Sequence, residues 1–290
     1  MKLAKTRIAL VVLAFLAATV LVVTASGCGV VNRIRSKNQL NEAARSFREA
    51  RYVEAEEHSR RAQELDPNNK TAPRFIARSI HAQYRPGVQQ PDNIAKAQEA
   101  IAAYQGILAN NPQDEEAYKA IAYLYGAIKE EQKLRDWITA RASNDSIEPT
   151  KRAEAYIVLA SKDWQCSFNI TESTSVKVTT VDPTNNKATV SYKKPADAKE
   201  FTQAQMCVKQ GLSEAEMAVK FDPNNESAWS YKTNLLLEAS KLAEMDGKAD
   251  QKAALTKEYE AALKRTTELS AATQKRKEEE AKQSPAPPKG

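Results

Sequence analysis

Few residues of this chain combine into a pattern that could carry out chemistry. It has two histidines, His58 and His81, on different predicted helix pairs, and three cysteines, Cys28, Cys166 and Cys207. No Cys-x-x-Cys, His-x-x-x-His or Asp-rich loop offers the spacing of metal ligands. No Gly-x-x-x-x-Gly-Lys-Ser/Thr run is present to hold a phosphate. We therefore expect no metal, no cofactor and no enzymatic activity.

The first 27 residues have the pattern of an export signal. Lys2, Lys5 and Arg7 form a basic start, residues 8–23 are uncharged and apolar, and small residues at 24–27 precede Cys28. This order resembles a bacterial lipoprotein signal peptide, in which the cysteine is lipidated on its thiol and becomes the new N-terminus.

The match to that signal departs at one position, and a second interpretation stays open. Ala25 stands where the family prefers leucine. Residues 8–27 are also about long enough to span a bilayer as an uncleaved signal anchor. Both interpretations place the rest of the chain in the cell envelope, tethered to a membrane and facing the periplasm or the exterior.

The net charge of the chain gives little support to nucleic-acid binding. The whole chain is +6, but the leader holds three of its 43 Lys and Arg residues and none of its 37 Asp and Glu residues. A mature chain would therefore be close to neutral for its size, and we expect no nucleic-acid partner.

The remaining cysteines fit an exported protein. If Cys28 is lipidated, Cys166 and Cys207 are left as a pair. We expect a disulfide between them in an oxidising compartment, because both lie beside the same interruption of the helical pattern. The alternative is two separate buried thiols.

A repeated helix stop organises the chain after residue 28. Residues 65–69 read Leu-Asp-Pro-Asn-Asn, residues 221–225 read Phe-Asp-Pro-Asn-Asn, and residues 110–114 are a looser copy. Each follows an alanine-spaced helical run. We expect Pro67 to begin the next helix and Asp66 to cap its first turn. Such a recurrence predicts a helical solenoid.

The spacing of small and aromatic residues resembles the tetratricopeptide repeat (TPR), a 34-residue helix hairpin. The positions that carry the resemblance are Ala100, Tyr104, Pro112, Tyr118, Ile121, Ala122, Tyr125, Tyr156, Leu159, Ala160, Gly211, Ala218, Pro223 and Trp229. The resemblance implies an all-α fold, a right-handed superhelix of about five helix hairpins over residues 28–273. Leu134 and Arg141 depart from it, because the family has small residues there. Residues 274–290 are predicted to be a disordered, charged, proline-containing tail.

The fourth unit contains the largest interruption, an insertion over residues 165–196. Residues 176–181 and 187–192 are short β-rich runs joined by the turn residues Asp-Pro-Thr-Asn-Asn. They predict a β-hairpin near residues 174–193. A mobile surface loop is the alternative, since a lone hairpin is marginal in water.

The resemblance also implies a concave groove that holds a partner peptide. Arg74 and Arg78 are one helical turn apart and, with Lys119, could meet an acidic segment. The alternatives are that Arg74 pairs with a nearby Glu and that Trp164 belongs to the core. The groove positions that the family's pattern assigns are Phe47, Arg74, Arg78, Lys119, Tyr123, Ser161, Trp164 and Asn234.

These patterns together favour a membrane-anchored, extracytoplasmic scaffold that binds other proteins. One alternative is a structural subunit of a fixed envelope, outer-membrane assembly or pilus complex. Others are a signal-anchored repeat protein without a lipid and an accessory subunit of an enzyme, which the missing catalytic groups disfavour.

Overall fold

The computed structural model describes residues 29–184 and 186–283, and the chain forms two compact units, residues 1–134 (unit 1) and residues 135–290 (unit 2). The predicted leader, with Cys28, lies outside the described residues. In chain order, the described part contains ten helices and one two-stranded sheet. The prediction of an all-α, TPR-like fold with an inserted β-hairpin is confirmed.

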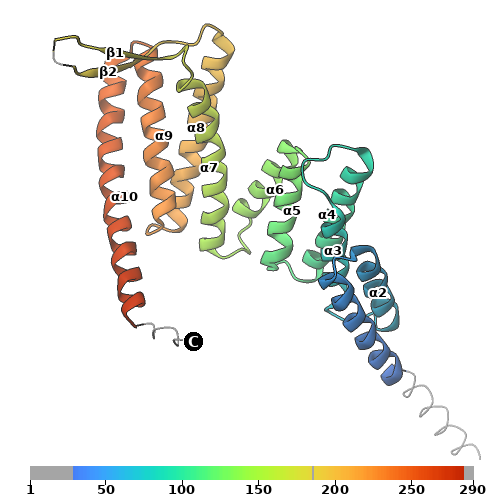
Figure 1. Cartoon of the computed structure of the whole chain (residues 1–290). Helices are drawn as coiled ribbons and strands as arrows, with labels where there is room; N and C mark the ends of the chain where they lie inside the picture. The colour runs from blue at the N-terminus through green and yellow to red at the C-terminus, as the bar shows by residue number, and fades with distance from the viewer. Residues whose placement is uncertain (1–28, 185, 284–290) are drawn as a thin grey trace, which may run out of the picture. The chain divides into compact units, whose positions relative to one another are not determined.

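Unit 1 is a succession of antiparallel helices (Figure 1). It begins with a helix over residues 29–48. Neighbours in sequence pack on one another, α2 on α3, α3 on α4 and α4 on α5. The helices that follow the first one are α2 (Tyr52–Leu65), α3 (Ala72–Gln83), α4 (Pro91–Asn110), α5 (Glu115–Ala127) and the start of α6 (Glu131–Ser143).

The core of unit 1 is built from small residues and isoleucine. Ala55 and Ala62, two turns apart on α2, are fully buried, as their seven-residue spacing predicts. Ile80 and Ile121 fill the centre of α3 and α5. Alanines at the contacts let the helix backbones approach closely, so the packing follows directly from the repeat pattern.

The repeated helix stop works differently from the prediction. α3 begins at Ala72 and not at Pro67, and the side chain that accepts its first-turn amides is Asn69, from Ala72 N at 3.1 Å. The equivalent last residues of the other two copies cap in the same way: Asp114 accepts from the third residue of α5, and Asn225 from the third residue of α9. Each helix ends two residues before the proline, and the Asn or Asp two residues after the proline caps the start of the next helix.

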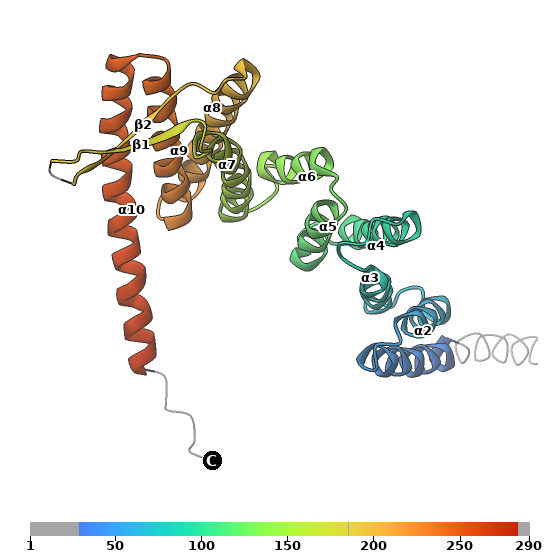
Figure 2. The same ribbon diagram turned by 45° about the horizontal axis from the view of Figure 1, so that its top comes forward.

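Unit 2 contains the end of α6 and four long or medium helices with the insertion between the first two. Its elements are α7 (Pro149–Thr171), β1 (Lys177–Val181), β2 (Ala188–Tyr192), α8 (Ala198–Phe221), α9 (Glu226–Met245) and α10 (Ala249–Gln283). α7 packs on both α8 and α9, and α9 packs on α8, α10 and β2. In both views the hairpin runs out past α10 (Figures 1 and 2).

Three predicted boundaries are corrected by unit 2. α7 continues to Thr171, so the insertion covers residues 172–197 and Cys166 lies inside the helix rather than after it. The helical face continues because Ser167 and Thr171 are buried against α9. α10 continues to Gln283, ten residues beyond the predicted tail boundary, because residues 274–283 are nearly all strong helix formers.

The inserted hairpin is antiparallel, and its register is fixed by five residue pairs from Lys177 with Tyr192 to Val181 with Ala188. Burial declines along both strands away from this first pair. At the base, Val176 is fully buried in an apolar cluster with Phe201 of α8 and Leu242 of α9. The base of the hairpin therefore belongs to the core of unit 2, and its outer half does not.

Candidate protein-binding surfaces

A buried carboxylate lies under the inserted hairpin. Glu238 of α9 is 1% exposed. Its Oε2 accepts hydrogen bonds from Ser167 Oγ at 2.9 Å and Thr171 Oγ1 at 2.7 Å, and its Oε1 lies 2.6 Å from Lys241 Nζ. Burying a charge is costly unless it is paired and hydrogen-bonded, and Glu238 has both kinds of partner. This arrangement joins the end of α7 to α9.

Lys241 connects that buried carboxylate to the hairpin. Its Nζ also lies 2.7 Å from Glu172, at the end of α7, and 5.0 Å from the ring centre of Tyr192 in β2. Burial acts to lower the pKa of Lys241, but its hydrogen bonds to Glu172 and Glu238 outweigh this and raise the pKa. The ammonium therefore stays charged in a site with little water.

Glu172 closes this network on the side of β1. It accepts hydrogen bonds from Lys241, from Lys177 of β1 and from the Tyr192 hydroxyl at 3.3 Å. Burial acts to raise the pKa of Glu172, but the two lysines outweigh it and hold the pKa at about 2. We call Glu172, Lys177, Tyr192, Glu238 and Lys241 the hairpin anchor.

The other strand is held from the end of α9. The Tyr192 amide donates to Glu244 Oε1 at 3.1 Å, and Lys194 Nζ lies 2.6 Å from Asp246 Oδ1. The Lys193 amide donates to the Val176 carbonyl at 2.9 Å, which extends the hydrogen-bond ladder by one step beyond the Lys177–Tyr192 pair at the base. Side chains of α7 and α9 thus fix both strands at their base.

The outer half of the hairpin presents apolar side chains to solvent. Val181 is 55% exposed and Val190 is 44% exposed. They lie on one face of the sheet, because Val190 pairs with Thr179 and Val181 is two residues further along β1. Within the described residues, no third strand pairs with either edge. An exposed edge beside apolar side chains is a surface on which an extended segment can pair.

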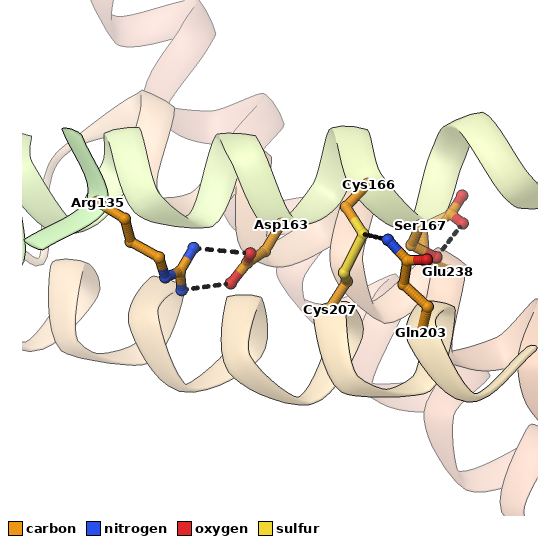
Figure 3. Close-up of a disulfide and its surroundings, with 7 residues drawn as sticks. All are labelled: Arg135, Asp163, Cys166, Ser167, Gln203, Cys207 and Glu238. Atoms are coloured by element: carbon orange, nitrogen blue, oxygen red, sulfur yellow. Dashed lines mark hydrogen bonds and ion pairs between the residues drawn. A yellow bond between two sulfur atoms is a disulfide. The ribbon is translucent and has the colours of Figure 1, made fainter. Parts of the chain in front are cut away.

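A disulfide joins the two helices that flank the insertion. Cys166 of α7 and Cys207 of α8 are bonded, with their Cα atoms 6.2 Å apart (Figure 3). This pairing is the one expected from the sequence. The bridge closes a loop of 41 residues that contains the whole hairpin. It therefore ties α7 to α8 independently of the hairpin anchor.

One helical turn before the disulfide, the same interface holds a second buried ionic cluster. Arg135 of α6 bonds both oxygens of Asp163, at 2.9 and 3.0 Å, and Glu214 of α8 at 2.7 Å. Burial, together with the charge of Asp163, raises the pKa of Glu214 to about 8 against the opposing effect of Arg135. Figure 3 shows the Arg135–Asp163 pair of this cluster, the disulfide and the Ser167–Glu238 contact in succession along α7.

The predicted basic groove of unit 1 has its arginines paired. Arg74 forms an ion pair with Asp114, and both nitrogens of the Arg78 fork bond Glu116, with Nη2 at 2.6 Å. Both acids precede or begin α5, so the pairs connect α3 to α5. The alternative, that Arg74 pairs with a nearby Glu, holds in part: Arg74 lies 3.7 Å from Glu116, but its shorter contact is with Asp114. Lys119 of α5 is exposed on the same helix face.

Three rings from three different helices form a group in the same part of unit 1. Tyr123 of α5 is exposed, and its ring centre is 5.7 Å from that of His81 on α3. His81 in turn contacts Tyr104, with Nδ1 3.3 Å from the hydroxyl. Burial lowers the pKa of His81 and raises that of Tyr104 to about 12, so both are neutral at pH 7. Phe47 is not part of this group; its ring packs on Tyr52 at 5.2 Å.

The predicted groove positions of unit 2 surround an aromatic cluster. Trp164 is half-buried, and its ring centre is 5.0 Å from Phe168 and 6.1 Å from Tyr231 of α9. The cluster borders buried core residues, so Trp164 serves packing as well as surface. Ser161 bonds its own helix, and Asn234 is half-buried on α9. Sequence reasoning missed Phe168 and Tyr231, although both lie one turn from a predicted position.

Within the described residues there is neither a cluster of metal-ligating side chains nor a helix that could span a membrane. No group of three or more His, Cys, Asp or Glu side chains is placed to hold a metal ion within residues 29–184 and 186–283. None of the helices in the same ranges is both long and apolar enough to cross a bilayer. The candidate anchor at residues 8–27 lies outside these ranges.

Comparisons with known proteins find solved structures of low similarity to this chain. No family model and no curated protein sequence matches the chain. Similar solved structures include the MamA RS-1 ArsTM double mutant (12% identity, 82% of this chain and 96% of that chain, TM-score 0.40). A tetratricopeptide repeat protein from Parabacteroides merdae (14%, 80% and 99%, 0.34) and Pseudomonas aeruginosa PilF (12%, 83% and 99%, 0.35) also match. With TM-scores this low, the fold is argued from the helices described above.

Proposed function

We propose that this protein is a membrane-anchored, extracytoplasmic scaffold that binds other proteins, and that the outer half of its inserted hairpin is a docking surface. The observation that carries the proposal is the contrast within the hairpin. Its base is fixed by the hairpin anchor, and its outer half exposes Val181 and Val190 beside strand edges that pair with no further strand in the part of the chain that the structure describes. A partner that adds an extended segment there would bury both valines and satisfy the edge.

The fixed base matters because it removes much of the cost of binding. A free two-stranded hairpin is marginal in water, and ordering it on binding would consume part of the interaction energy. Here the buried charges of Glu238 and Lys241 order the base before any partner arrives. The exposed half is therefore preorganised for a partner.

The envelope location rests on the leader and the cysteines. Residues 1–28 carry the lipoprotein-type pattern, and the bonded pair Cys166–Cys207 suits an oxidising compartment. Lipidation of Cys28 and an uncleaved anchor at residues 8–27 are separated by the intact mass of the protein extracted from membranes. A mass of a chain that starts at a lipidated Cys28 supports the lipoprotein form, and that of an unprocessed chain starting at Met1 supports the anchor.

A second function is favoured by the same hairpin, namely a subunit of a fixed envelope complex. In that case the outer half is covered permanently rather than visited by clients. The two functions differ in stoichiometry: a fixed subunit co-purifies with its partner at a constant ratio after detergent extraction. A scaffold for clients yields substoichiometric, exchangeable partners.

Photocrosslinking in cells tests the docking surface. A photoreactive amino acid is placed at Val190 and, as a matched control, at Leu263 of α10, which is 41% exposed. A third variant places it at Tyr123 in the predicted groove of unit 1. We expect crosslinked partner bands at Val190 and none at Leu263. Bands at Tyr123 alone would move the docking surface to the groove, and no bands at any position would contradict the scaffold.

A further inference from the structure

The first helix exposes an apolar stripe at its start. Val30, Val31 and Ile34 are all exposed, and Ile34 is 56% exposed. At about 100° per residue these three positions lie on one side of the helix. The buried residues Ser36 and Ala43 lie on the opposite side, against the rest of unit 1.

Basic residues flank the stripe on both sides. Arg33 and Lys37 lie at one border, and Arg35 lies at the other. All three are exposed, and none has an ion-pair partner within the described ranges 29–184 and 186–283. An apolar centre with cations at its margins is the pattern of a helix face that rests in the interface of an anionic membrane.

Packing on the rest of unit 1 begins only after this segment. Ser36 is the first fully buried residue, and its Oγ donates to the Ala62 carbonyl of α2 at 2.8 Å. Asn69 adds a hydrogen bond to the same hydroxyl at 3.2 Å. The first two turns, residues 29–35, therefore lie between the proposed membrane tether and the first residue that packs on α2.

The position of this segment in the chain selects the membrane as its occupant. The apolar run at residues 8–23 and Cys28 come directly before it. With a rise of about 1.5 Å per residue, Ile34 is about 7–8 Å along the helix from residue 29, where the described helix begins. A tether at residue 28 holds all three apolar side chains within the depth of the headgroup region, which is on the order of 10 Å.

We propose that residues 29–37 lie on an anionic lipid surface, with Val30, Val31 and Ile34 in the interface and Arg33, Arg35 and Lys37 at the phosphates. This inference rests on the proposed membrane anchor. It goes further than the anchor in one respect, because it makes the first helix part of the membrane attachment. The orientation of the first helix relative to the bilayer surface is then restricted. A flexible tether alone would leave this face in water.

Fluorescence quenching by lipids tests the inference on the full chain. An environment-sensitive fluorescent amino acid replaces Ile34 in one variant and Val53 of α2, which is 58% exposed, in the control. Each protein is reconstituted into vesicles of phosphatidylcholine and phosphatidylglycerol containing nitroxide-labelled lipid. We expect a blue shift and strong quenching at position 34, neither at position 53, and weaker quenching at 34 in vesicles of pure phosphatidylcholine.

Charge variants on the same helix provide a second readout. Replacing Arg33→Gln together with Arg35→Gln should weaken the surface association by roughly fivefold per lost cation. The matched control, Arg45→Gln with Arg48→Gln, removes the same charge two to four turns further along and should leave quenching unchanged.

The outcomes separate this inference from the proposed N-terminal membrane anchor. If the chain floats with the vesicles but the probe at position 34 is no more quenched than at position 53, the inference fails and the proposed membrane anchor stands. If the chain does not float, both fail. A probe at position 34 that is shielded from iodide but not quenched by lipid indicates a protein occupant, such as a second copy, and also overturns the inference.

Discussion

The two units contain the same kind of helix hairpin, but different kinds of contact stabilise the helices within each unit. Unit 1 relies on close packing of alanine and isoleucine, and its ion pairs, such as Arg78 with Glu116, lie at the surface. Unit 2 adds two ionic clusters and a disulfide along α7, with partners on α6, α8 and α9. The contacts of Arg135 join residues that are 28 and 79 positions apart, and Lys241 bonds Glu172, 69 positions away.

The difference shows what an insertion requires of a repeat. In unit 1 each helix packs mainly on its sequence neighbours, as in other solenoids, and ion pairs such as Arg78–Glu116 reach the next helix but one. In unit 2 the chain leaves the stack after Thr171 and returns at Ala198, so the ends of α7 and α8 are not joined by a short turn. The disulfide, the hairpin anchor and the Arg135 cluster take over that role.

The largest effect is expected at Glu238. Glu238→Ala leaves Lys241 buried without its nearest partner and should destabilise unit 2 by about 3–5 kcal/mol. Hydrogen exchange should then speed up in α7, α9 and the hairpin, and stay unchanged in α2–α4. The control Glu99→Ala removes the surface contacts of Glu99 to Arg60 and Lys96 and should cost about 0–1 kcal/mol. Equal effects of the two variants would remove the distinction between the units.

The disulfide comes next in size. Cys166→Ala with Cys207→Ala should lower the stability of unit 2 by about 2–4 kcal/mol, because the unfolded chain regains a loop of 41 residues. Thermal unfolding with and without reductant provides the measurement. The wild-type protein should respond to reductant and the double variant should not. Free thiols at both positions in protein purified without reductant would contradict the bond.

Adding a methyl group at one helical glycine in each unit compares how tightly the two units are packed at those positions. A Cβ at Gly211 of α8 would lie 2.7 Å from Leu235 and 3.0 Å from Asp163, whereas at Gly106 of α4 nothing lies within 4 Å. Gly211→Ala should therefore destabilise by about 1–3 kcal/mol through overpacking. Gly106→Ala should stabilise by about 0.5–1 kcal/mol through helix propensity. Urea unfolding of both variants would show whether the signs differ.

The smallest expected effect is a pH dependence confined to unit 2. The folded pKa of Glu214 is raised to about 8, against 4.5 in the unfolded chain. Its contribution is thus fully present below pH 4.5 and is lost as pH rises through 8. Between pH 7 and 8 the loss should be about 1 kcal/mol. In the Glu214→Gln variant the unfolding midpoint should depend less on pH over this range. If the midpoint falls with pH as steeply as in the wild-type protein, the titrating group is another residue.

Sequence reasoning reached the repeats and the insertion but not the contacts that hold the insertion. The Asp-Pro-Asn-Asn stops and the alanine spacing are local signals, and they located the helix pairs and the interruption. The hairpin followed from its β-rich runs, and the disulfide from cysteine number and position. Arg74 illustrates the limit, because its pairing with Asp114 depends on how two helices 40 residues apart face each other.

Glu238 and Lys241 illustrate the same limit more strongly. A Glu and a Lys three residues apart on a helix usually form a solvated surface pair. Nothing local distinguishes this pair from Arg265 and Glu268, which are exposed on α10. The burial of Glu238 comes from α7 and the hairpin meeting over α9, so it becomes visible only once the tertiary structure is known.

Hydrogen exchange of the hairpin amides in the purified protein tests the central claim, that the insertion is a folded surface held on unit 2. We expect the paired amides of β1 and β2 to exchange slowly, at rates closer to those of α7 than to those of an unstructured peptide. We also expect Glu238→Ala to abolish this protection. Hairpin amides that exchange at the unstructured rate in the wild-type protein would show a mobile loop and overturn the proposed anchoring of the hairpin.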